Sequence, residues 1–202
     1  MSFKNELNLK IENILEEIRY KNYIRFEVSK WSYSKYRKHP EIFFKNVTDK
    51  VYNIFKNFEY AFDILKVDIF LDYSENKIVM KRKIKKAIKE VYDSFKISNK
   101  ISKPNEIIYN IYYDEYDGYK GLKIRLIWNL KIRSINFYNV LYEISKTDFG
   151  GCKYLCSYTT FIDSFNNIAF NFYDDRGLDI FSDKKEILFH FYNNKVDIIN
   201  MP

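Results

Sequence analysis

The chain has little glycine, proline, cysteine or histidine: five, three, two and two, respectively, among 202 residues. Flexible linkers between domains are rich in glycine and proline, so we predict one domain (residues 1–202) with a single sizeable core. No glycine lies in a GxGxxG or GxxxxGK frame, and no serine nucleophile elbow is present. These absences argue against the common enzyme classes, although catalytic groups can converge from distant positions.

Cysteine and histidine suggest no metal or redox site. Cys152 and Cys156 alternate with Tyr154, which predicts that both thiols face one side of a strand. A redox pair or a zinc site requires a two-residue spacing or further ligands, and His39 and His190 lie far away in the sequence. We expect two buried, reduced thiols, no metal and no cofactor.

Long apolar runs are missing as well. None approaches the length of a membrane span, and the first residues, MSFKNELNLKIENILEEI, place charge in every turn, unlike a signal peptide. We expect a soluble, cytoplasmic protein that does not contact membranes.

The positive charge of the chain is concentrated in residues 77–103. This segment holds ten basic and two acidic residues, a net of +8, which leaves 24 basic and 25 acidic residues elsewhere. Ile84, Ile88 and Val91 form a narrow apolar stripe, so we predict a helix with one buried edge and a cationic outer face. Such a face attracts nucleic acid or an acidic protein, the alternative being an ordinary solvated lysine face. The predicted partner-binding residues are Lys81, Arg82, Lys85, Lys86 and Lys89.

A second basic stretch, WSYSKYRK (Trp31–Lys38), is also rich in aromatic residues. It has no clear period and is predicted to be a loop. Its rings and cations are of the kind that stack on bases and contact phosphate. A chain with 19 tyrosines and 18 phenylalanines also contains such stretches by chance or for packing at an edge. The secondary partner-binding set predicted here is Trp31, Tyr33, Tyr36 and Arg37.

The segment Phe170–Glu186, FNFYDDRGLDIFSDKKE, is predicted to run from a half-buried strand through a tight turn into the last helix. Gly177 is expected to end the strand with a positive φ, which glycine adopts at little cost. Asp183 and Glu186 have the capping-box spacing of a helix N-terminus.

The carboxylates of this turn have two interpretations. Clustered carboxylates bind hard cations and raise one another's pKa, as in a metal or acid/base site, and a carboxylate-dependent nuclease centred on Asp174 and Asp175 is one alternative. In the other interpretation, Arg176 forms bidentate hydrogen bonds with one aspartate while the others cap backbone groups. No histidine, lysine or glutamate lies at a spacing that would complete a reaction, so we predict a structural turn. Its residues are Asp174, Asp175, Arg176, Gly177 and Asp179.

The same segment resembles the C-terminal signature of a bacterial family, domain of unknown function 3885. The run YDDRGLD at 173–179 carries the resemblance. Ile24–Glu27 and Tyr142–Gly150 fit two weaker motifs, the second without the proline that family members have before the glycine. The resemblance extends from Tyr23 onward and implies a shared fold, but no chemistry is assigned to the family. Some members resemble immunity or inhibitor genes of bacterial conflict systems.

Three function classes follow. The first is a non-catalytic inhibitor or immunity-type protein of a bacterial or phage conflict system. It would neutralise a nuclease-type toxin or CRISPR effector through its basic, tyrosine-rich surface. The second is an RNA- or DNA-binding protein that uses the helix in 77–103. The third is the carboxylate-dependent nuclease. We favour the first, because of the family resemblance and the missing chemistry.

Hydrophobic periodicity predicts an α+β fold of about six mostly antiparallel strands and four to five helices in one compact domain. Ser134 is the predicted N-cap of the fourth helix. The helices are predicted at 4–19, 40–58, 77–103, 134–146 and 183–193, and the strands at 23–28, 61–73, 107–114, 121–130, 154–162 and 167–173.

Overall fold

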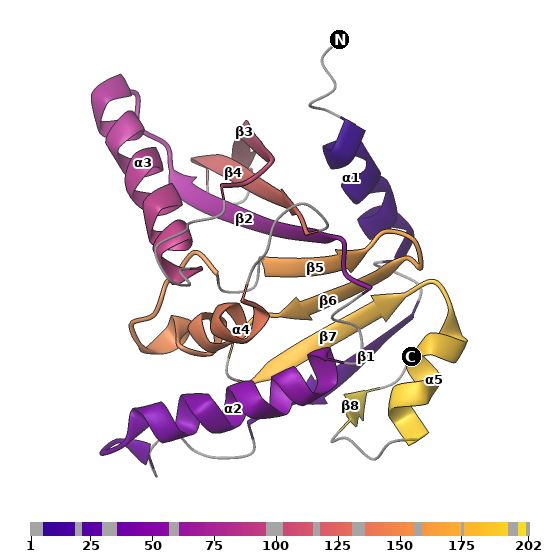
Figure 1. Ribbon diagram of the computed structural model, residues 1–202. Helices are drawn as coiled ribbons and strands as arrows, with labels where there is room; N and C mark the ends of the chain where they lie inside the picture. The colour runs from indigo at the N-terminus through magenta and orange to yellow at the C-terminus, as the bar shows by residue number, and fades with distance from the viewer. Residues whose placement is uncertain are drawn as a thin grey trace.

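An eight-stranded sheet with only antiparallel neighbours forms the centre of the computed structural model (Figure 1). The strands are β1 (Asn22–Glu27), β2 (Ile64–Asp72), β3 (Glu106–Asp114), β4 (Tyr119–Asn129), β5 (Thr159–Asp163), β6 (Ile168–Phe172), β7 (Gly177–Ser182) and β8 (Ile198–Asn200). Their order is β3-β4-β2-β5-β6-β7-β1-β8, so the first strand of the chain pairs with two of the last.

Helices cover both faces of the sheet. They are α1 (Glu6–Ile18), α2 (Pro40–Phe55), α3 (Lys77–Ser94), α4 (Phe137–Ser145), the short 3-10 helix η3 (Thr147–Phe149) and α5 (Lys185–Asn193). Buried residues of α2, α3 and α4 share one core with the sheet, whereas α1 packs on the opposite face (Figure 1). α5 lies beside β7 and β1.

The structure describes most of the chain. None of the helices in the described part combines the length and apolar character needed to cross a bilayer. The described ranges are 6–18, 22–29, 36–56, 61–95, 103–114, 118–130, 136–155, 159–174, 176–193 and 198–200, without the side chains of 190–193 and 198–200.

The face under α2, α3 and α4 is packed with aromatic rings. Phe55, in the last turn of α2, is fully buried. Its ring centroid lies 4.8–5.2 Å from those of four other rings, within the range of favourable edge-to-face and stacked contacts. Those four rings belong to Phe62, Phe137, Phe161 and Phe170.

The face under α1 is covered only in part. Ile11, Ile14 and Ile18 recur at helical spacing and pack on a small apolar patch of four strands. The patch consists of Ile64, Ile127, Ile162 and Ala169. Polar residues occupy much of the rest of this face, and they form the cavity described below.

The α+β prediction is confirmed, but the sheet has eight strands rather than about six. The prediction that the chain passes from the aspartate turn into the last helix is wrong, because β7 lies between them. Leu178 and Ile180 of β7 are buried. Asp183 forms no capping box with α5 in the described part of the chain: its Oδ2 accepts a hydrogen bond from Asn167 Nδ2 at 3.1 Å, and its buried Oδ1 has no hydrogen-bond partner there.

Two further boundaries differ from the predictions. The N-cap of α4 is Asn136, whose side chain accepts from the Asn139 N–H at 2.9 Å, and not Ser134, which lies outside the described residues. The predicted 77–103 helix ends at Ser94.

The predicted strand 154–162 begins only at Thr159. Cys152 therefore lies in a turn rather than on a strand, where its carbonyl accepts a hydrogen bond from the Leu155 N–H at 3.0 Å. Its thiol is free, and burial raises the pKa of this group. Cys156 lies outside the described residues.

Candidate functional site

The basic residues predicted to bind a partner lie on α3. The helix is capped by Asn76, whose side chain accepts from the N–H groups of Ile78 and Val79 at 3.0 and 3.2 Å. Met80, Ala87 and Val91 anchor its inner edge in the core. All five predicted residues are exposed, namely Lys81, Arg82, Lys85, Lys86 and Lys89.

Acidic residues neutralise only the C-terminal half of this face. Lys86 lies 3.8 Å from Glu90 and Lys89 lies 2.7 Å from Asp93, both as i,i+4 pairs. Among the described residues, Lys81, Arg82 and Lys85 have no acidic partner, and neither does Lys77 one turn earlier. The first two turns of α3 therefore present uncompensated positive charge.

A row of apolar and tyrosine side chains projects from the edge strand β3, on the same side of the sheet as α3. In antiparallel pairs, residues directly opposite each other point to the same face. Three residues of the row lie opposite core residues of β4, which places the row on the α3 side. Burial, and secondarily the neighbouring Tyr109 phenol, raises the pKa of Tyr92 on α3, which is consistent with the row lying beside the helix. The β3 row consists of Ile107, Tyr109, Ile111 and Tyr113, which are 38–64% exposed.

The secondary set does not join this surface. Tyr36 is half-buried, with its ring centroid 5.6 Å from that of Phe43 on α2, while Arg37 is exposed. Both precede α2, and α4 lies between α2 and α3 (Figure 1). Trp31 and Tyr33 lie outside the described residues.

Asp174 closes the turn that carries the family signature. Its carboxylate is buried, with 1% exposure for the residue. Oδ1 accepts from the backbone N–H groups of Arg176 and Gly177 at 2.8 and 3.3 Å, and Oδ2 accepts from Arg176 Nε at 2.9 Å and from its Nη2. The Arg176 carbonyl in turn accepts from the Val28 N–H at 3.0 Å, so the turn is tied to the end of β1.

Asp179 is held by a different arginine. Its two oxygens accept from Nε and Nη2 of Arg25 on β1 at 2.7 and 2.8 Å. The Arg25 guanidinium lies 5.8 Å from the centroid of the Tyr173 ring. Asp174 and Asp179 thus belong to separate ion pairs, and Asp175 lies outside the described residues. No group of three His, Cys, Asp or Glu side chains in the described part of the chain is placed to hold a metal ion.

Gly177 differs from its prediction. It does not have a positive φ. A Cβ at this position would collide with the ring and hydroxyl of Tyr173. Glycine therefore leaves room for the Tyr173 side chain close to its Cα, and a larger residue at this position would force that side chain to move.

Sequence reasoning missed a polar row that crosses the face under α1. Each of its five residues lies directly opposite the next on a neighbouring strand, from β2 through β5, β6 and β7 to β1. In order, the polar row consists of Lys66, Thr160, Asn171, Asp179 and Arg25.

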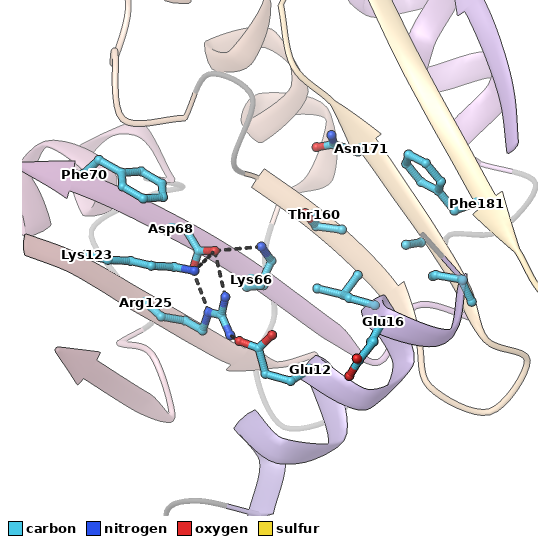
Figure 2. A pocket seen from close by; sticks show the side chains of 13 residues that line it. Glu12, Glu16, Lys66, Asp68, Phe70, Lys123, Arg125, Thr160, Asn171 and Phe181 are labelled. Carbon is cyan, nitrogen blue, oxygen red and sulfur yellow. Dashed lines mark hydrogen bonds and ion pairs between the residues drawn. The ribbon is translucent and has the colours of Figure 1, made fainter. Parts of the chain in front are cut away.

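Asp68 lies next to Lys66, at the β2 end of the polar row, and its carboxylate contacts three cationic side chains (Figure 2). Arg125 Nε and Nη2 donate to its two oxygens at 2.7 and 2.9 Å. Lys66 Nζ and Lys123 Nζ lie 2.9 and 3.2 Å from Oδ2. Arg125 Nη1 also contacts Glu12 of α1, so the helix is joined to the cluster.

The titration of this cluster follows from its burial and its charges. Burial alone would raise the pKa of Asp68. The hydrogen bonds from Arg125 and the charges of Lys66, Arg125 and Lys123 more than reverse this, so the pKa lies well below its ordinary value. Burial lowers the pKa of Lys66, against the attraction of Asp68, and the positive charges of Arg125 and Lys123 lower it further.

A cavity of about 630 Å³ lies between α1 and these strands. Figure 2 shows the Asp68 cluster on its floor, Glu12 and Glu16 on the helix, and Thr160, Asn171 and Phe181 across β5, β6 and β7. A volume of this size is typical of small-molecule sites.

The sequence shows part of this arrangement. Lys66 and Asp68 alternate with core residues of a predicted strand, which assigns both to its polar face, and such a face is normally exposed to solvent. What the sequence does not show is that Arg125 pairs opposite Asp68 and that α1 lies over both.

Neither a curated protein nor a solved structure matches the chain. One family model does match, over residues 5–199, which is nearly the full length. The chain therefore belongs to the family described as Domain of unknown function (DUF3885).

Proposed function

We propose that the protein is a non-catalytic binding protein of the inhibitor or immunity type, which engages an acidic protein partner through α3 and the β3 row. The observation that carries the proposal is that uncompensated cations on α3 and an exposed apolar row on the edge strand β3 lie on the same side of the sheet. A binding surface combines these two properties when apolar anchors provide affinity and charges select the partner.

The charge of α3 favours an acidic partner. Lys77, Lys81 and Arg82 lie in the first two turns of the helix, where the macrodipole already places positive charge, so they do not stabilise it. A concentrated positive field of this kind accelerates association with a negatively charged surface.

The β3 row favours a protein over a nucleic acid. Tyr109 and Tyr113 would suit either, because tyrosine anchors protein interfaces and stacks on bases. Ile107 and Ile111 share the row with them, and an aliphatic side chain offers no stacking surface. β3 is also the edge of the sheet, where an extended segment of a partner can add as a further strand.

A nuclease is a natural partner for such a surface. Two-metal nuclease sites are lined by carboxylates, and a cationic face can dock on such a site or compete with its nucleic acid. The proposed partner is therefore a nuclease-type toxin or CRISPR effector. Asp174 and Asp179, each held by its own arginine, have no role in this proposal.

Charge reversal tests the proposal. The partner is first captured with the wild-type protein from the native host and purified, and its affinity is then measured by calorimetry. We expect Lys81→Glu, Arg82→Glu and Lys85→Glu together to weaken binding at least about tenfold and to relieve inhibition of the partner's nuclease activity. The matched control is Lys45→Glu, Lys184→Glu and Lys185→Glu, which changes the net charge equally at exposed sites on α2, before α5 and at its start.

Equal affinity of the two triple variants would contradict the proposal. A second measurement addresses nucleic acid directly, by fluorescence anisotropy with RNA and DNA at rising salt. We expect weak binding that collapses between low and physiological salt. A salt-resistant complex that the α3 variant loses would overturn the proposal in favour of a nucleic-acid-binding function.

A further inference from the structure

The cavity under α1 is lined by polar groups that folding has removed from water. Lys66, Asp68, Arg125 and Thr160 are each 7% exposed or less. Burial of charged and polar groups is unfavourable unless each finds partners. The opposite face of the same strands is apolar, so these polar groups are confined to the face under α1. Their concentration around an open volume points to a ligand.

Hydrogen-bonding capacity remains unused in the cavity. Within the described part of the chain, the Asn171 Oδ1 atom is buried and has no hydrogen-bond partner. Lys66 Nζ can donate three hydrogen bonds, and its one partner among the described residues is Asp68. Thr160 lies directly between the two, opposite Lys66 on one side and Asn171 on the other. Cross-strand neighbours lie about 5 Å apart, so one small molecule can reach all three.

The buried charge of the cavity is positive. Lys66, Lys123 and Arg125 surround a single buried carboxylate, that of Asp68. The acids of α1 compensate this charge less well, because Glu12 and Glu16 are exposed and water screens them. An anion bound beside Lys66 would neutralise part of this excess positive charge.

The walls add apolar surface at both ends. Phe70 lies on the β2 side of the cavity and Phe181 on the β7 side (Figure 2). Leu15 of α1 also lines the cavity. A polar floor between apolar walls is suited to an organic molecule rather than a bare ion.

We propose that this cavity binds a small organic anion, which presents a carboxylate or phosphate group to Lys66 and Lys123 and an N–H donor to Asn171 Oδ1. The site is independent of the α3 surface, since it lies on the opposite face of the sheet.

The titration of Lys66 supports this site. The groups that face Lys66 are Asp68 on its own strand, Lys123 and Arg125 on β4, and Glu12 and Glu16 on α1. Burial lowers the pKa of Lys66 in the empty site, and an anion would raise it again. Binding therefore strengthens as the pH falls through the pKa of Lys66.

Four small probes test the proposal by amide NMR titration: acetate, inorganic phosphate, N-acetylglycine and N-acetylsarcosine. The last two differ by one methyl group that removes the N–H donor. We expect N-acetylglycine to bind about fivefold tighter than N-acetylsarcosine, as one hydrogen bond to a buried acceptor provides, and Asn171→Leu to abolish this preference. The relative affinities of acetate and phosphate identify the anionic group of the ligand.

Two lysines of β4 provide a matched pair of variants. Lys123→Gln removes a cation of the cavity, and we expect all four anions to bind about fivefold more weakly. Lys120→Gln removes a lysine paired with Glu75 outside the cavity, and we expect no change. Shifts absent from β2, β5 and β6 for every probe would overturn the proposal and indicate a cavity filled by water alone. Equal affinities of N-acetylglycine and N-acetylsarcosine in the wild-type protein would overturn the role of Asn171, whatever the stability of the variants.

Discussion

Beneath α2, α3 and α4 the central strands present phenylalanines to one another, whereas beneath α1 the same strands present lysine, aspartate, arginine and asparagine. β2 shows the contrast within one element, since Val67 and Ile69 face the aromatic core while Lys66 and Asp68 line the cavity. One face stabilises the fold by close packing, and the other holds charges whose burial is unfavourable by itself. The difference indicates that stability resides on the first face and ligand recognition on the second.

The largest effect is expected on the aromatic face. Phe55→Ala removes a fully buried ring with four aromatic rings at 4.8–5.2 Å, which should destabilise the protein by about 4 kcal/mol. Phe70→Ala on the cavity side, where the ring is only half-buried, should lower the free energy of unfolding by about 1 kcal/mol. Urea denaturation of both variants measures the difference. Similar losses would show that the two faces contribute alike.

Removing the buried carboxylate should have the next largest effect. Asp68→Asn leaves Lys66, Lys123 and Arg125 without their shared counterion, and we expect a loss of about 3 kcal/mol. Lys66→Met leaves Asp68 with two cations and removes an amine that is unfavourable to bury, so it should change stability by less than about 1 kcal/mol. Denaturation midpoints at neutral pH test the pair. A large loss in Lys66→Met would mean that the cluster depends on all of its charges.

The smallest effect concerns pH. The pKa of Lys66 is lowered in the folded state, while that of the unfolded chain stays near the ordinary lysine value of about 10.4. Between these two values the unfolded chain binds more protons, so stability rises with pH. The penalty for burying the charged amine is complete below the folded pKa and disappears as the pH rises toward the unfolded one. Wild-type protein should therefore gain stability relative to Lys66→Met over that window in thermal melts, and a constant difference would contradict the lowered pKa.

Local patterns predicted the elements that obey a single period. The helical spacing of α2 and α3 and the alternation of β2 are all visible in the sequence, and the structure has all three elements, although α3 ends at Ser94 rather than at residue 103. β7 was missed although Leu178 and Ile180 alternate with Asp179, because the adjacent turn and capping signals suggested a helix start. In the folded protein, this segment is a strand because it pairs with β1, which lies more than 150 residues earlier in the sequence.

The candidate sites depend on which strands become neighbours. The exposure of α3 follows from its own composition, and the structure agrees. The β3 row is exposed because β3 is an edge strand, and the polar row exists because five strands adopt one register. Neither the edge position nor the register is encoded within a single segment, so Asn171 and Lys66 could not be associated from the sequence.

The position of β1 has a consequence for how the protein is made. This strand is synthesised long before its two neighbours in the sheet, β7 and β8. The Arg25–Asp179 pair and the hydrogen bond from the Val28 N–H to the signature turn can therefore form only after Asp179 and the signature turn have been synthesised. Contacts between segments so far apart in the sequence slow folding. Until β7 and β8 have been synthesised, the edges of β1 can pair with other strands, including those of other chains.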